Sequence, residues 1–142
     1  MELGTKGRRV YIGKLAGTSV FDPLGDQVGK VHDVVVVFRL KSEANVIGVV
    51  VEVGPRKRVF LPLTRITSIE SGSVITTGLL NIRSFNQRPI ETLVVSELFD
   101  RVVTMNDGSG QVQILDVAMR QRRPKDWVIS TLHVQRVRTS AL

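Results

Sequence analysis

One apolar run, residues 46–53, limits what this chain can fold into more than any other stretch. It reads Val-Ile-Gly-Val-Val-Val-Glu-Val, so most of its side chains are apolar and branched at Cβ. Such side chains have restricted rotamers and pack well on a pleated surface. The run is too short to span a bilayer. It therefore predicts a central β-strand that is buried on most of both faces and covered by the neighbouring strands.

Composition narrows the class of protein. The 142 residues suffice for one ordinary domain or two very small ones, and 42% of them are hydrophobic, as in a folded chain. The absence of cysteine excludes disulfides and cysteine nucleophiles and fits a reducing compartment. No apolar segment follows the basic N-terminus and no apolar run reaches ~18 residues, so we expect neither a signal peptide nor membrane insertion. We predict a cytoplasmic protein, or the cytosolic part of a membrane-associated one.

Turn signals separate short β-rich runs, and no segment before Asn81 has sustained helical periodicity. In Asp22-Pro23-Leu24-Gly25 the Asp accepts backbone N–H groups, the Pro presets φ and the Gly closes a turn. Pro62 cannot donate to a β-ladder, so its strand ends there or lies at an edge. The pattern predicts an all-β fold of the antiparallel barrel or sandwich type. The expected strands before Asn81 cover residues 15–21, 27–38, 46–53, 58–62 and a hairpin within 66–75.

The chain resembles itself at an offset of 83 residues. This ungapped offset places the turn glycine Gly25 on Gly108 and Asp33 on Asp116, together with several apolar strand positions. A single register that carries a turn and two strands predicts two homologous β units. The predicted organisation is a basic leader (residues 1–9), a first unit (10–78), a connection (79–97) and a second unit (98–142).

The second unit lacks a counterpart of the strand at residues 59–62, which at the same offset would begin at residue 142. Two explanations stay open: the native protein continues beyond Leu142, or the connection completes the second barrel. We expect the first. Within the connection, residues 92–95 favour an extra strand and residues 96–99 favour a helical turn.

The first unit carries a spaced set of residues that resembles a known family. The set begins with Leu15-x-Gly17-x-x-Val20-x-Asp22-x-x-Gly25-x-x-x-Gly29-x-Val31-x-Asp33-Val34 and continues through residues 46–51 and 59–62. It resembles the PRC-barrel family, which includes the small barrel of the photosynthetic reaction-centre H subunit and the C-terminal barrel of the ribosome-maturation factor RimM. The second unit resembles that family more weakly, since Met105 replaces the aspartate and Val112 replaces the last glycine. The resemblance implies two small PRC-barrel-like antiparallel barrels in tandem, the second incomplete at its C-terminus.

A narrower resemblance rests on further stretches, which are residues 61–69, 74–79, 88–93, 115–119 and 126–128. These are similar to the N-terminal tandem PRC-barrel region of actinobacterial proteins that continue into an MgtE-type N-domain and CBS domains. Such proteins are related to the cytosolic part of magnesium transporters. The resemblance implies a regulatory or scaffolding role in the cytosolic N-terminal part of a larger protein.

No residues have the spacing of a catalytic or metal site. His32 and His133 are the only histidines and neither has a partner at metal-ligand spacing. No nucleophile elbow, P-loop or dinucleotide-binding motif is present. We therefore predict no catalytic residue, no metal and no cofactor, and a protein that is not an enzyme. For Asp33 and Asp116 we favour a structural role, in which each carboxylate accepts N–H bonds from the neighbouring turn, over a magnesium cluster with nearby aspartates.

Basic residues suggest where a partner binds. The net charge is +7, and residues 120–138 hold six basic residues against Asp126 alone. A positive surface attracts nucleic acid, anionic lipid or an acidic protein, and Arg and Trp are frequent at binding hot spots. The predicted partner-binding residues are Arg56, Lys57 and Arg58 at a hairpin tip and Arg120, Arg122, Arg123, Lys125 and Trp127 in a basic loop.

The basic groups, together with the lack of a catalytic motif, predict a non-catalytic binding or regulatory module. We expect it to contact a protein partner or downstream domains of its own chain. The alternative is RNA or ribosome binding of the ribosome-maturation type, against which the scarcity of aromatic residues for base stacking counts. Contact with an anionic membrane surface and formation of a homo-oligomer also stay open.

Overall fold

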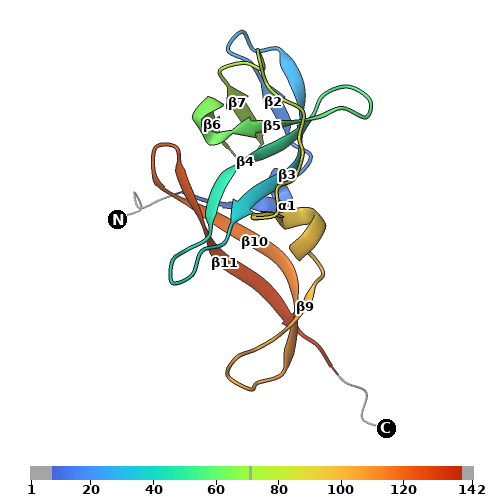
Figure 1. Ribbon diagram of the computed structural model, residues 1–142, viewed down its shortest axis with the longest axis vertical. Helices are drawn as coiled ribbons and strands as arrows, with labels where there is room; N and C mark the ends of the chain where they lie inside the picture. The colour runs from blue at the N-terminus through green and yellow to red at the C-terminus, as the bar shows by residue number, and fades with distance from the viewer. Residues whose placement is uncertain (1–7, 71, 139–142) are drawn as a thin grey trace.

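The computed structural model describes residues 8–70 and 72–138, and it is an all-β fold (Figure 1). These described residues form eleven strands, which belong to one sheet. The all-β class that the turn signals predict is therefore confirmed. Most of the predicted leader (residues 1–7), Ser71 of the last predicted turn and residues 139–142 lie outside the described residues. Within the described part, no helix is long and apolar enough to cross a membrane.

The strands divide between two halves of the chain. The first half contains β1 (Arg9–Tyr11), α1 (Ile12–Leu15), β2 (Ser19–Phe21), β3 (Gln27–Val37), β4 (Asn45–Glu52), β5 (Arg58–Pro62), the helical turn η1 (Leu63–Arg65), β6 (Ile66–Ile69) and β7 (Ser73–Thr76). The second half contains β8 (Glu91–Leu93), the helical turn η2 (Val94–Leu98), β9 (Val102–Thr104), β10 (Gln111–Arg123) and β11 (Asp126–Arg136). The sheet runs β1-β10-β11-β4-β3-β2-β7-β6, with β5 on β4, β8 on β3 and β9 on β10.

Strand β4 is the central strand that the apolar run predicts. It pairs antiparallel with β3 on one side and with β5 on the other. Val49 and Val51 lie in the main core, whereas Val50 lies in a second cluster on the opposite face with Val35 and Phe60. A fully buried valine stabilises a fold by roughly 1.5–3 kcal/mol, so the four buried valines of β4 together contribute on the order of 6–12 kcal/mol.

The turn after β2 forms as its residues predict. The Asp22 carboxylate accepts N–H bonds from Leu24 and Asp26, and Gly25 has a φ of 88°. The predicted strand over residues 15–21 is wrong in its first part, because residues 12–15 form the helical turn α1. Gly17, at a φ of 89°, then redirects the chain into β2, and this left-handed conformation favours glycine.

The two halves of the described chain have the same order of elements. The order β1-α1-β2-β3-β4 recurs as β8-η2-β9-β10-β11. The N–H of Gly17 donates to the carbonyl of Val31 at 2.7 Å, and 83 residues later the N–H of Asp100 donates to the carbonyl of Ile114 at 2.7 Å. The two halves therefore share local geometry up to the end of β4 and of β11.

The first strand of each half is exchanged with the other half. Strand β1 pairs with β10, while its repeat counterpart β8 pairs with β3. Where the halves meet, β4 pairs with β11 through Asn45 and Val128, which are themselves 83 residues apart. One core consequently draws on both halves, with Ile12, Val49 and Val117 all fully buried in it.

Candidate functional site

The two predicted basic groups lie far apart. Arg56 and Lys57 form the turn between β4 and β5, whereas the basic loop is the turn between β10 and β11. Figure 1 shows these turns on opposite sides of the molecule. On β4, Val46 pairs with Trp127 and Glu52 pairs with Arg58. These two positions are six residue steps apart, which corresponds to ~20 Å along a strand. The structure does not bring the two groups into one surface.

Carboxylates of the same chain contact the arginines of the β10–β11 turn. Arg120 lies 2.9 Å from Glu43, and Arg122 lies 3.1 Å from Asp126 and 3.5 Å from Glu43. Arg123 donates two hydrogen bonds to Asp126. Three guanidinium groups therefore share two carboxylates, so the positive charge of this turn is partly compensated within the fold.

Acid is expected to loosen this network. The hydrogen bond from Arg122, followed by that from Arg123, lowers the pKa of Asp126 in spite of its partial burial. A carboxyl with a lower pKa in the folded state stabilises the fold above its unfolded pKa, and this stabilisation is lost as the pH falls through the folded pKa. In urea unfolding measured at a series of pH values, Asp126→Asn should lose less stability than the wild type below about pH 4. If the stability of Asp126→Asn and that of the wild type fell in parallel with pH, Asp126 would not be the group whose protonation loosens this network.

Lys125 and Trp127 tie the β10–β11 turn to the first half of the chain. Lys125, at a φ of 64°, donates from Nζ to the carbonyl of Ile66 at 2.6 Å, and Thr64 offers a second carbonyl at 3.4 Å. Trp127 is buried in the main core. Two residues of the predicted partner-binding basic loop, Lys125 and Trp127, thus also hold the two halves together.

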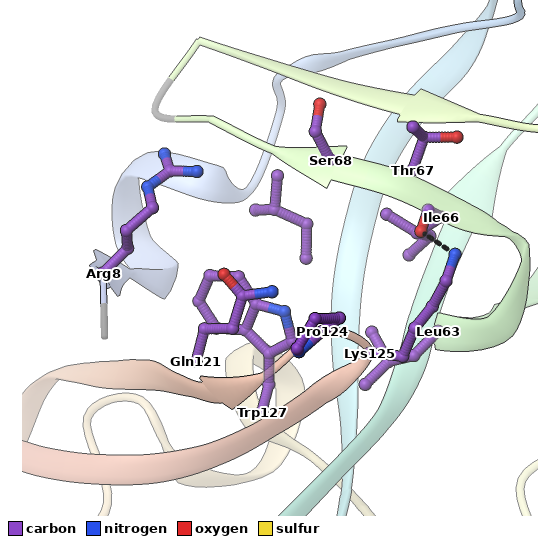
Figure 2. A pocket seen from close by; sticks show the side chains of 10 residues that line it. Arg8, Leu63, Ile66, Thr67, Ser68, Gln121, Pro124, Lys125 and Trp127 are labelled. Carbon is purple, nitrogen blue, oxygen red and sulfur yellow. Dashed lines mark hydrogen bonds between the residues drawn. The ribbon is translucent and has the colours of Figure 1, made fainter. Parts of the chain in front are cut away.

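A small pocket lies where the two halves meet, between β6 and the β10–β11 turn (Figure 2). Its volume is about 130 Å³. Arg8, Gln121 and Lys125 provide charged and amide groups at its walls, and Figure 2 shows the Trp127 ring between Gln121 and Pro124. The remaining lining comes from Leu63 and residues 66–69. Pockets for drug-sized ligands are usually about 300–1,000 Å³, so this one has room for a single side chain.

Sequence reasoning identified Lys125 and Trp127 but missed Arg8, Gln121 and the β6 residues of this pocket. Arg8 lies beside them because β1 crosses into the sheet of the second half, where its N–H and carbonyl groups meet β10. Its guanidinium pairs with Glu70, just after β6, at 3.0 Å. No local pattern in the sequence signals such a crossing.

The other predicted group is a shallow, open surface. Arg56 has a φ of 63° at the tip of the turn, and Arg58 lies 3.8 Å from Glu52. The hollow that Arg56, Lys57 and Arg58 line is completed by Ser84 and Phe85. The charged groups of Arg56, Lys57 and Arg58 face solvent. An exposed ion pair such as Arg58–Glu52 contributes little to stability.

Asp33 and Asp116 perform equivalent structural tasks. Asp33 accepts hydrogen bonds from the N–H groups of Val95 and Ser96, at the start of η2 in the other half. Asp116 accepts one from Gly13, which is the repeat counterpart of Ser96 and lies in α1. Each aspartate thus holds the helical turn of the opposite half. Within the described residues, no group of three or more His, Asp or Glu side chains could hold a metal ion.

Comparisons with known proteins match the two halves of the chain to two different families. The actinomycete SH3 domain family matches residues 92–142, and no curated protein matches the chain. A second PRC-barrel unit at residues 98–142 therefore stays a prediction, as does the link to magnesium-transporter-type proteins. The PRC-barrel domain family matches residues 7–79, which include β1 to β7 and the spaced glycines and aspartates of the first unit. Because this match covers more than half of the 142 residues, the chain belongs to the PRC-barrel domain family.

Proposed function

We propose that this chain is a non-catalytic protein-binding module, and that a partner inserts one side chain into the pocket between β6 and the β10–β11 turn. The observation that carries the proposal is the pocket itself, which combines apolar walls with Arg8, Gln121 and Lys125 at the junction of the two halves. Ligand sites are common where structural units meet. The buried carboxylate of Asp33 accepts bonds from backbone and hydroxyl groups, which supports a structural and not a catalytic use.

Two observations favour a protein partner over RNA. Phosphate binding needs available Arg and Lys side chains, and the arginines of the β10–β11 turn are engaged by Glu43 and Asp126. Base stacking needs an exposed aromatic ring beside the basic residues, and Trp127, the aromatic residue of the β10–β11 turn, is buried. Membership of the PRC-barrel family also suits a small binding module.

The narrower expectations form part of the proposal. A cytosolic N-terminal role beside an MgtE-type N-domain rests on sequence resemblance alone. A cytoplasmic location is supported by the absence of cysteine. The partner can be a separate protein or another domain of the same chain. In both cases the same pocket would receive the side chain.

Filling the pocket should abolish binding. Gln121→Phe places a larger side chain at its wall, and the matched control Gln113→Phe changes another half-buried glutamine of β10 outside the pocket. Peptides selected from a random library against the wild type should change the fluorescence of Trp127, the only tryptophan. We expect at least a tenfold weaker affinity for Gln121→Phe and an unchanged one for Gln113→Phe.

The same assay separates the two classes of partner. A selected peptide should keep most of its affinity between low and physiological salt. Total RNA that binds tightly, with an affinity that falls steeply with salt and that Arg56→Ala or Arg123→Ala weakens, would overturn the proposal in favour of RNA binding.

A further inference from the structure

The two halves differ in how their central strands are covered. In the first half, β5 pairs with β4 from Gly48 to Glu52 and covers its outer edge. Val49 and Val51, which lie in the main core with Val59 and Leu61 of β5, are 0% exposed. The repeat counterparts of these two valines are Leu132 and Val134 of β11, at the same offset of 83 residues. They are 47% and 37% exposed, so the second half leaves uncovered what the first half buries.

The uncovered side of β11 is an open strand edge. On one side β11 pairs with β10 along most of its length, and on the other it pairs with β4 at Trp127 and Val128 alone. In the described part of the chain, the outer edge beyond Ile129 has no strand partner. An open edge presents N–H and C=O groups that another extended segment can pair with.

The turn between β3 and β4, residues 38–44, adds apolar surface beside this edge. It lies next to β11, because the N–H of Ile129 donates to the carbonyl of Ala44 (Figure 1). Phe38 and Leu40 in this turn are 53% and 95% exposed. The equivalent turn of the second half, between β10 and β11, instead packs against β6 through Lys125. Among the described residues, the second half has no strand equivalent to β6 against which the β3–β4 turn could pack.

Charge indicates what kind of segment fits. No Asp or Glu occurs between Trp127 and Arg138, and the β3–β4 turn carries Arg39 and Lys41. Its one carboxylate, Glu43, is engaged by Arg120. The edge is thus flanked by positive charge, which attracts and orients acidic partners.

We propose that β11, where the repeat would place a counterpart of β5, is instead a docking edge for an acidic, extended segment of a separate polypeptide, which adds to the sheet as an antiparallel strand along Leu132–Arg136. Alternate residues of this segment are apolar and cover Leu132 and Val134, while the acidic residues between them lie on the other face of the strand and are attracted by the basic residues that flank the edge. Such strand addition combines backbone hydrogen bonds with side-chain specificity. Thr131 stands where the first half has Gly48, so the added strand runs straight and does not fold over the sheet as β5 does. This surface is distinct from the pocket at β6.

The test uses a seven-residue peptide of alternating glutamate and valine as the probe. In NMR spectra of the ¹⁵N-labelled chain, this peptide should shift the amide signals of residues 132–136 and slow their hydrogen exchange. A peptide with lysine in place of glutamate should bind at least tenfold more weakly. Leu132→Asp should reduce the affinity at least tenfold, whereas Val102→Asp, at an equally exposed position (46%) on β9, should not.

Other outcomes would overturn the inference. If residues 132–136 show slow exchange without peptide and the chain dimerises with concentration, a second copy is the occupant. Shifts that centre on the pocket, or no shifts at all, would also reject it. Gln121→Phe should bind the acidic peptide normally, so failure of this proposal and failure of the pocket proposal are distinguishable.

Discussion

Replacing Asp33 with asparagine is expected to lower the free energy of unfolding by about 3 kcal/mol. The carboxylate is fully buried and accepts hydrogen bonds from the N–H groups of Val34 (2.8 Å), Val95 (2.7 Å) and Ser96 (2.9 Å), as well as from the Ser96 hydroxyl (2.7 Å). Asparagine has nearly the same shape but turns one acceptor into a donor. That NH₂ group would face N–H groups, which leaves buried donors without partners.

Urea unfolding measured by circular dichroism tests this loss, and the repeat provides the control. Asp116 is half-buried and accepts bonds from Gly13 and Val117 at 2.9 and 2.8 Å. Asp116→Asn should therefore cost about 1 kcal/mol. Equal losses for the two variants would show that burial and the number of donors do not set the strength of these links.

Gly48→Ala is expected to destabilise the fold by about 2 kcal/mol or more. A Cβ atom at this position would lie 2.5 Å from the carbonyl oxygen of Leu61 and 2.8 Å from the ring of Phe60. The carbonyl belongs to β5, so relief requires a backbone shift. Where no such contact exists, replacing glycine by alanine in a compatible conformation stabilises a protein by ~0.4–1 kcal/mol. The sign of the change is therefore diagnostic.

Thermal and urea unfolding measure this change, with Thr131→Ala as the matched control. Thr131 occupies the equivalent place on β11, where no strand of the described chain crosses, and its removal should change stability by roughly 0.5 kcal/mol or less. A stabilised or neutral Gly48→Ala variant would contradict the close crossing of β4 and β5.

Local patterns determined much of the fold. The β-branched run predicts β4, because side chains of this type occupy a pleated surface that is buried on both faces. Asp22 and Gly25 predict their turn, since a carboxylate acceptor and a positive φ are local requirements. The 83-residue offset predicts the second set of strands, because equivalent residues make equivalent backbone bonds. The strand at residues 58–62 is found with the same limits.

Only the tertiary structure shows that β1 and β8 pair with strands of the opposite half, and that a pocket forms between β6 and the β10–β11 turn. The exchange of β1 and β8 has no local signal, because any strand with a suitable apolar pattern can pair with either edge. That exchange brings Arg8 to the pocket and Asp33 to η2. The basic loop predicted from sequence is partly neutralised, since Glu43 is distant in the chain but adjacent in space. Sequence specifies elements through local geometry, whereas their partners depend on contacts between residues that are far apart along the chain.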